Sequence, residues 1–148
     1  MEIIYREGIL EKQIDQLIEY SKTDESVQRF TADAERFKDR KAFNDWKSKG
    51  RKIFTLSDEK DNLLGIIWIG QKEIEVGDKK YDKTFAIRIY GEARGKGLAL
   101  DFMKKSVKEK GIWIECSADN LPAQALYKKF GFELVSKPDK NNKVILVY

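Results

Sequence analysis

The stretch from Tyr90 to Ala99, taken with the segments on either side, constrains the fold most strongly. This region contains an apolar run, TFAIRIY, that is typical of a strand, then a glycine-rich turn, and then a run with helical spacing that begins near Lys96. A helix start leaves backbone N–H groups unpaired and carries about half a positive charge. Gly95 and Gly97 allow a bulky anion to approach the backbone. Together with the charges of Arg94 and Lys96, this junction predicts a phosphate site.

Two other phosphate-binding signatures do not fit this turn. A Walker A loop needs four residues between its first two glycines, whereas three separate Gly91 from Gly95, and Gly97 stands where that loop has Ser or Thr. A dinucleotide-binding turn needs a third glycine, which is missing after Gly97. The glycines alone are also compatible with a purely structural turn, so the flanking segments have to identify the ligand.

The chain contains no histidine, which narrows the chemistry that it can perform. Ser-His and Cys-His nucleophile pairs cannot be built, and zinc or iron sites lose their usual nitrogen ligand. We therefore expect carboxylates, tyrosine, backbone amides or a bound co-substrate to do the chemistry, without a metal. The single cysteine, Cys116, cannot form an intramolecular disulfide, and we expect no neighbouring group to activate it as a nucleophile.

Length and charge narrow the class of protein. The 148 residues include 29 basic and 25 acidic ones, interleaved along the chain, and the net charge is +4. This pattern favours a mixed-charge surface over a basic nucleic-acid-binding face. No apolar run is long enough to span a membrane and no signal-peptide pattern is present, so we expect a cytoplasmic protein that binds neither membranes nor nucleic acid. The length predicts a single domain over residues 1–148.

Helical spacing of apolar residues predicts about four helices. The first covers residues 8–22. A second helical region lies between residues 31 and 50, where a change of phase in the apolar stripe indicates two short helices or a kink. The third runs from the glycine turn toward Gly111, and the fourth covers residues 120–131.

Short apolar or alternating runs predict six or seven strands in a mixed central sheet, which is an α/β (α+β) fold. They are residues 1–6, 51–57, 63–76, 84–90, 112–116, 132–136 and 143–148. The second to fourth should form an antiparallel meander, in which Gly65 and Gly70 mark bulges or close backbone approaches. Since a helix connects strand 84–90 to strand 112–116, these two should be parallel.

Two segments carry a resemblance to a known family. The first, IYGEARGKGLALDFM, holds the glycine turn, and the second, IECSADNLPAQALYKKFGFELVS, holds Asn120, Ala123, Tyr127, Gly131 and Phe132 at a specific spacing. With the order of the predicted elements, they resemble the GNAT family of N-acetyltransferases, which binds acetyl-CoA at such a turn. The resemblance implies parallel strands that splay apart and an acetyl-CoA-dependent N-acetyltransferase.

The resemblance also implies which residues hold coenzyme A. Amides of the turn bind its pyrophosphate, strand 84–90 pairs with the pantetheine arm, Asn120 holds the arm from the other side, and Tyr127 lies near the thioester sulfur. The residues so implied are Ile87, Ile89, Tyr90, Ala93, Arg94, Gly95, Lys96, Gly97, Leu98, Ala99, Asn120, Ala123 and Tyr127. The turn departs from the family pattern at Glu92, where Gln or Arg is usual, and at Gly91, where Pro is frequent.

A thioester is already activated, so a histidine-free enzyme needs only to position an amine, stabilise an oxyanion and protonate a thiolate. The backbone N–H of Ile89, or alternatively that of Tyr90, is the expected oxyanion donor. Tyr127 suits thiolate protonation, although a tyrosine that only packs on a helix face would look the same in the sequence. Glu73 or Glu75, which share a strand face, is the expected general base, directly or through water.

The acceptor is expected to be a small-molecule or peptide amine. Phe30, Trp46 and Trp68 belong either to the core or to the acceptor site. A rival interpretation is an acyl-CoA-binding sensor or scaffold of the same fold, and a third is a basic nucleic-acid-binding domain. The closing hairpin offers a sheet edge for a homodimer, so a monomer and a homodimer both fit the sequence.

Overall fold

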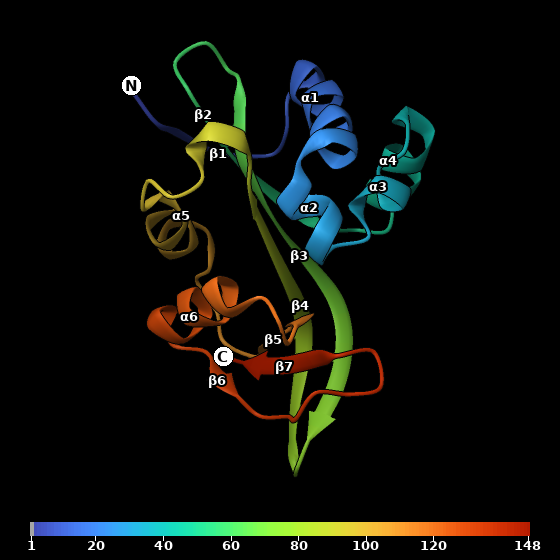
Figure 1. Ribbon diagram of the computed structural model, residues 1–148, viewed down its shortest axis with the longest axis vertical. Coiled ribbons are helices and arrows are strands. Elements are labelled where there is room, and N and C mark those ends of the chain that lie inside the picture. Colours follow the sequence, from blue (N-terminus) through green and yellow to red (C-terminus); the bar gives the residue numbers. More distant parts are fainter. Residues whose placement is uncertain (1) are drawn as a thin grey trace.

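The computed structural model describes residues 2–148, which form a mixed sheet of seven strands in the order β1-β2-β3-β4-β5-β7-β6 (Figure 1). The expected fold class and strand number are thus confirmed. Met1, where the expected first strand begins, lies outside the described residues. The elements are β1 (Ile4–Glu7), α1 (Glu11–Thr23), α2 (Glu25–Phe30), α3 (Asp33–Arg36), α4 (Arg40–Lys47), β2 (Lys52–Ser57), β3 (Leu63–Val76), β4 (Lys79–Ile89), the 3-10 helix η1 (Gly91–Ala93), α5 (Leu98–Ser106), β5 (Ile112–Ser117), α6 (Leu121–Phe130), β6 (Glu133–Leu134) and β7 (Lys143–Val147).

The described residues contain six α-helices, more than the four expected. The expected break between residues 31 and 50 is confirmed, because α3 and α4 are separate helices. The prediction missed α2, which has only six residues. This helix forms because the Asp24 carboxylate accepts hydrogen bonds from the N–H groups of Ser26 (3.1 Å) and Val27 (3.2 Å). None of the helices in residues 2–148 is long and apolar enough to cross a membrane.

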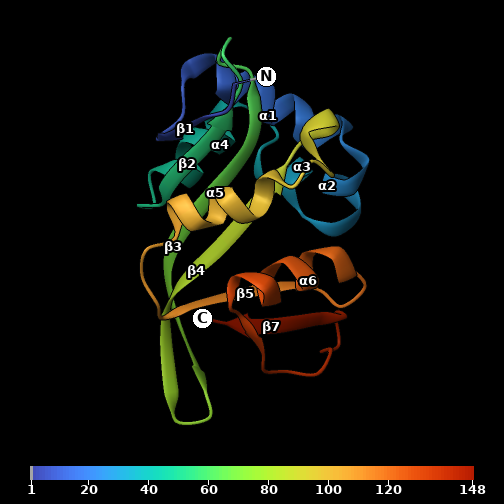
Figure 2. The same ribbon diagram turned by 90° about the vertical axis from the view of Figure 1, so that its left-hand side faces the viewer.

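Three element boundaries differ most from the expectation. Helix α5 ends at Ser106, since the next residue is extended, and does not continue to Gly111. Strand β4 begins at Lys79, because the β3–β4 ladder continues up to the pair formed by Val76 and Lys79. The strand expected over residues 132–136 is reduced to the two residues of β6. Because the β3–β4 ladder continues to Val76 and Lys79, the hairpin of these two strands projects beyond the rest of the sheet (Figures 1 and 2).

The expected meander and parallel pair are both present. Strands β1 to β4 are antiparallel neighbours, and β4 is parallel to β5. Within the described residues, β4 and β5 pair at two positions, Lys83 with Ile112 and Thr84 with Trp113. Beyond Thr84, β4 runs toward the start of α5 whereas β5 turns away beside β7 (Figure 2). This divergence opens one edge of β4.

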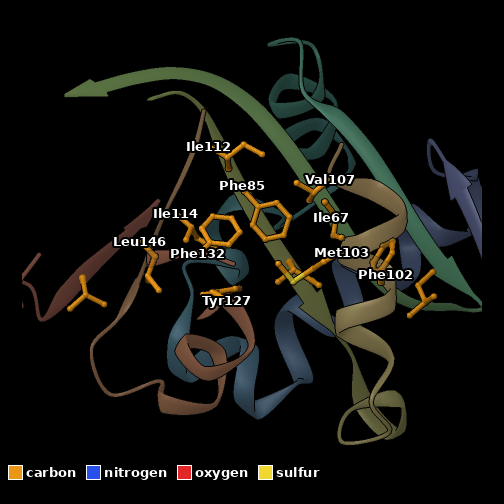
Figure 3. Packing of buried hydrophobic residues seen from close by; sticks show 13 residues of the cluster. Ile67, Phe85, Phe102, Met103, Val107, Ile112, Ile114, Tyr127, Phe132 and Leu146 are labelled. Atoms are coloured by element: carbon orange, nitrogen blue, oxygen red, sulfur yellow. The ribbon is translucent and has the colours of Figure 1, made fainter. Parts of the chain in front are cut away.

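Helices cover both faces of the sheet and enclose two clusters of buried side chains. Beneath α5 and α6, Phe85 packs against Tyr127 with other apolar residues (Figure 3). Beneath α1 to α4, the second cluster contains Trp46 and Trp68. Since side chains alternate along a strand, Phe85 faces the first cluster and Ala86 the second. Successive side chains of β4 thus contribute to the buried clusters on opposite faces of the sheet.

Candidate active site

A cleft of about 830 Å³ opens where β4 and β5 diverge. Its wall includes the turn before α5, the diverging parts of β4 and β5, the start of α6, and residues of α2 to α4, so it reaches both faces of the sheet. Among the expected site residues, the wall holds Phe30, Trp46, Trp68, Ile87, Ile89, Ala93, Arg94, Gly95, Gly97, Leu98, Ala99, Asn120, Ala123 and Tyr127. As formed by residues 2–148, it does not include Glu73, Glu75, Tyr90 or Lys96.

The glycine turn presents the start of α5 to the cleft. Gly95 and Gly97 have positive φ angles of 81° and 72°, and Gly97 is the N-cap of this nine-residue helix. In the described part of the chain, no side chain caps α5. Its first backbone N–H groups, near Leu98 and Ala99 on the cleft wall, are therefore available to an anion. Lys96 is exposed and is not part of the wall.

Arg94 fixes the turn in place. Its Nη2 donates to both carboxylate oxygens of Asp24, at 2.8 and 2.7 Å, and to the carbonyl oxygen of Ile89 at 2.9 Å. The N–H of Gly91 donates to the same carboxylate at 3.0 Å. Burial alone would raise the pKa of Asp24, but the hydrogen bonds from Gly91 and Arg94 hold it below its usual value. The charged Asp24 thus connects the turn to α2.

The backbone of β4 distinguishes the two expected oxyanion donors. The N–H of Tyr90 donates to the carbonyl oxygen of Leu64 on the β3 side at 2.8 Å. Successive N–H groups of a strand point to opposite sides, so those of Ile87 and Ile89 point toward the edge that β5 has left. The Tyr90 ring is buried and stacks on Tyr20, with centroids 4.5 Å apart. Of the two backbone groups, the Ile89 N–H is the one at the cleft.

Helix α6 brings Asn120, Ala123 and Tyr127 to the cleft wall. Asn120 is the N-cap, and its Oδ1 accepts a hydrogen bond from the N–H of Ala123 at 3.2 Å. The Tyr127 side chain is 5% exposed and its ring meets Phe85 edge to face, with centroids 6.3 Å apart. Burial raises the pKa of Tyr127, although the charge of Arg88 opposes that rise. The phenol is therefore protonated at neutral pH.

The aromatic residues expected at the acceptor site belong to both the core and the cleft. Trp46 and Trp68 are 7% and 6% exposed, yet both lie on the wall. Their rings meet edge to face, with centroids 5.2 Å apart and an interplanar angle of 87°. Phe30, at the end of α2, lies on the same wall. The two alternatives for these residues are thus compatible with each other.

Sequence reasoning missed the ion pairs beside these rings. Asp33 is fully buried and accepts hydrogen bonds from Arg88 Nε (2.7 Å) and Nη2 (3.2 Å), and it also pairs with Arg36. Burial, the largest single influence, would lower the pKa of Arg88, but the charge and hydrogen bonds of Asp33, together with Tyr90 and Tyr127, raise it. A signal was present, because Arg88 is the one charged residue in the apolar run TFAIRIY.

The two expected base residues lie elsewhere. Glu73 and Glu75 are exposed on the outer part of β3, and Glu75 Oε1 is 3.9 Å from Lys80 Nζ. Cys116 lies on the cleft wall, and burial raises its pKa to about 11, so it is a thiol at neutral pH. Residues 2–148 contain no group of three or more cysteine or acidic side chains placed to hold a metal ion.

Comparison with known proteins identifies the family. The profile described as "Acetyltransferase (GNAT) family" matches residues 14–132, which is most of the chain. The protein therefore belongs to the GNAT acetyltransferase family, as the two sequence segments indicated. By family, it is an acetyltransferase. A comparison with curated protein sequences finds no match.

Several solved structures share the fold at low sequence identity. Arabidopsis thaliana NAA60 in complex with acetyl-CoA is 18% identical, with a TM-score of 0.70 over 99% of this chain and 98% of that chain. Spermidine N-acetyltransferase from Vibrio cholerae, in complex with CoA and spermine, is 17% identical, with a TM-score of 0.66 over 97% and 92%. A phosphinothricin acetyltransferase from Sinorhizobium meliloti, in complex with AcCoA, is 17% identical, with a TM-score of 0.67 over 99% and 87%.

Proposed function

We propose that the protein binds acetyl-CoA along the cleft between β4 and β5 and transfers the acetyl group directly to a primary amine in a ternary complex. One observation carries the proposal: the parallel strands diverge after two paired positions, which leaves the edge of β4 open beside the start of α5. An open strand edge offers an extended amide chain the hydrogen bonds of a missing strand. A helix start offers N–H groups to a diphosphate.

On the donor side, we assign the pantetheine arm and its thioester to the open edge of β4 at Ile87 and Ile89. Asn120 uses its carbonyl oxygen to cap α6, so its Nδ2 group is the one left to donate to the arm from the opposite wall. The amides from Ala93 to Ala99 would receive the pyrophosphate. Arg94 contributes by holding the turn through Asp24.

The transfer needs one bond to form and one to break. The amine nitrogen attacks the thioester carbonyl carbon, a C–N bond forms, and the C–S bond breaks. The N–H of Ile89 donates to the carbonyl oxygen while negative charge develops on it. Tyr127 gives its hydroxyl proton to the departing sulfur and regains a proton from solvent before the next turnover. Its location on the wall and its protonated state support this role, while burial makes it a weaker acid than an ordinary tyrosine.

The general base stays a prediction. Glu73 and Glu75 are exposed and are not part of the cleft wall, so we expect either to take the proton of the attacking ammonium only through water. Profiles of rate against pH for Glu73→Gln and Glu75→Gln test this role. Profiles that match the wild type in both variants would remove these two residues from the mechanism.

The similar structures support an amine acceptor without selecting one. They include NAA60 in complex with a bisubstrate analogue, a spermidine N-acetyltransferase and a phosphinothricin acetyltransferase. We also propose a cytoplasmic location, with which the free thiol of Cys116 is compatible. Fractionation of cells and light scattering of the purified protein test the location and distinguish a monomer from a homodimer.

Release of CoA thiol tests the proposed transfer. The purified protein is incubated with acetyl-CoA and a panel of primary amines, and the acetylated amine is identified by mass spectrometry. We expect amine-dependent thiol release and an increase in melting temperature with CoA. An acyl-CoA sensor would show the temperature shift without thiol release, and a nucleic-acid-binding domain would show neither.

A further inference from the structure

The acceptor end of the cleft, on the α1 to α4 side of the sheet, carries an excess of positive charge. The guanidinium carbon of Arg88 lies 4.8 Å and that of Arg36 lies 5.6 Å from the centre of the Trp68 ring. The guanidinium carbon of Arg51 lies 4.9 Å from the centre of the Trp46 ring. All three arginines are on the cleft wall. Glu115, on β5, is the one acidic residue of the wall in the described part of the chain.

The charges within this end do not balance. Asp33 is a single carboxylate that pairs with both Arg36 and Arg88. Within residues 2–148, Arg51 has no carboxylate within salt-bridge distance, and its Nη1 donates to the carbonyl oxygen of Trp46 at 2.8 Å. Three guanidinium groups against one carboxylate leave two positive charges uncompensated beside a largely buried aromatic surface. A partly buried arginine normally has an anionic partner.

The position of Arg51 shows that its partner is not the CoA pyrophosphate. Its side-chain stem lies over Gly70, where an added Cβ would be 3.8 Å from Arg51 Cγ, and Gly70 pairs with Thr84 of β4. Thr84 is five residues before Ile89, so roughly 17 Å of strand separates this position from the turn before α5. Arg51 also packs on Trp46, on the face of the sheet that α1 to α4 cover, whereas α5 lies on the opposite face.

We infer that the acceptor is a small primary amine that carries an anionic group, a carboxylate or a phosphoryl oxyanion, and that Arg51 with Arg36 binds this group. The inference rests on the proposed function of the same cleft. Trp46 and Trp68 lie on the cleft wall beside these arginines, and they would offer an apolar surface to a short aliphatic segment between the amine and the anion. Guanidinium groups bind carboxylates and phosphoryl groups through paired N–H donors.

The electrostatics of Arg51 agree with this assignment. Burial, and then the neighbouring charge of Arg36, lower the pKa of Arg51. An anion between the two guanidinium groups would remove that repulsion. A polyamine such as spermidine would instead add positive charges to an end that already has an excess, which is unfavourable by several times the thermal energy at short range.

Matched pairs of acceptors test the inference on the wild-type protein. Each pair has the same chain with and without the anionic group: β-alanine against propylamine, γ-aminobutyrate against butylamine, and L-methionine against L-methioninamide. Glycine against aminomethylphosphonate distinguishes a carboxylate from a phosphoryl group. We expect kcat/KM to be at least about tenfold higher for the anionic member of the best pair, and lowest for spermidine.

Three variants test the residue assignment. For an anionic acceptor, Arg51→Gln should raise KM by about 10-fold to 100-fold, while the CoA affinity and the KM for the neutral amine stay unchanged. Arg51→Lys should recover part of the loss and keeps the test valid if Arg51→Gln does not fold. Lys49→Gln removes the same charge from an exposed neighbour that is not on the wall, so we expect wild-type kinetics.

The outcomes separate this inference from the proposed function. Turnover with neutral amines or spermidine at least as fast as with anionic amines would overturn the inference and leave the proposed transfer intact. An unchanged KM for the anionic acceptor in Arg51→Gln would likewise overturn the role of Arg51. Absence of thiol release with every amine would overturn the proposed transfer, and the inference with it.

Discussion

Asp24 and Arg94 are seventy residues apart in the sequence, yet Arg94 Nη2 lies 2.8 and 2.7 Å from the two carboxylate oxygens of Asp24. The same carboxylate caps α2 and accepts the N–H of Gly91. One largely buried side chain thus fixes both the first turn of α2 and the glycine turn before α5. Loss of this contact should affect stability and CoA binding together.

Arg94→Gln should lower the free energy of unfolding by about 1 to 2 kcal/mol, because it leaves the buried Asp24 carboxylate without its charged partner. The loss should not be larger, since the Arg94 side chain is 42% exposed and solvent screens its charge. The melting temperature should fall by about 3 to 8 °C. The dissociation constant of CoA should rise up to about tenfold, because the loosened turn must be ordered on binding. Lys96→Gln removes the same charge from an exposed position of the turn, so its melting temperature should match the wild type.

The lowered pKa of Asp24 predicts a stability difference that depends on pH. A carboxylate with a lower pKa in the folded than in the unfolded state stabilises the fold fully above its unfolded pKa of about 4. That contribution is lost as the pH falls through the folded pKa. The difference in unfolding free energy between wild type and Asp24→Asn, from urea titrations, should therefore be largest near neutral pH and decrease toward about pH 3. A difference independent of pH would show that Asp24 acts without its charge.

Tyr127→Phe should lower kcat by about 100-fold, because the phenylalanine ring keeps the packing against Phe85 and removes only the proton donor. The CoA affinity measured by calorimetry should stay within about twofold of the wild type. Tyr81→Phe, on the outer part of β4, is the matched control and should turn over normally. Equal kcat in both variants would exclude Tyr127 as the acid.

Gly65 and Gly70 of β3 should respond differently to alanine. A Cβ at Gly65 would lie 2.8 Å from the backbone oxygen of Arg88, whereas a Cβ at Gly70 would lie 2.9 Å from the Thr84 hydroxyl, which can rotate away. Gly65→Ala should therefore cost about 1 to 3 kcal/mol and Gly70→Ala clearly less. Chemical denaturation compares the two, and an equal loss would show that the backbone at Gly65 can shift.

The part of the site that the sequence predicts is local in the chain. The strand, the turn with Gly95 and Gly97, and the helix after it follow from short-range periodicity and from the backbone freedom of glycine. The cap at Asn120 is likewise a contact between residues three apart. Given the order of these elements, the rules for strand–helix–strand connections predict that β4 and β5 are parallel neighbours. Local patterns therefore predicted the fold class and the donor end of the cleft.

The missed features depend on contacts between distant residues. The Asp33–Arg88 pair spans 55 residues and the Asp24–Arg94 pair 70, and no periodicity links such positions. Helix α2, with six residues, is too short for its apolar spacing to be distinctive. The excess charge around Arg51 arises because the fold brings Arg36 of α3 and Arg88 of β4 to the same cleft wall. The acceptor end of the cleft could therefore be recognised only from the three-dimensional arrangement of these residues.

Initial rates over a grid of acetyl-CoA and amine concentrations test direct transfer in the cleft most directly. Because both substrates must be bound together, double-reciprocal plots at fixed amine concentrations should intersect, and no acetylated protein should be detected by mass spectrometry after acetyl-CoA alone. Parallel lines, together with an acetyl group retained on the protein, would contradict the account by showing a covalent intermediate.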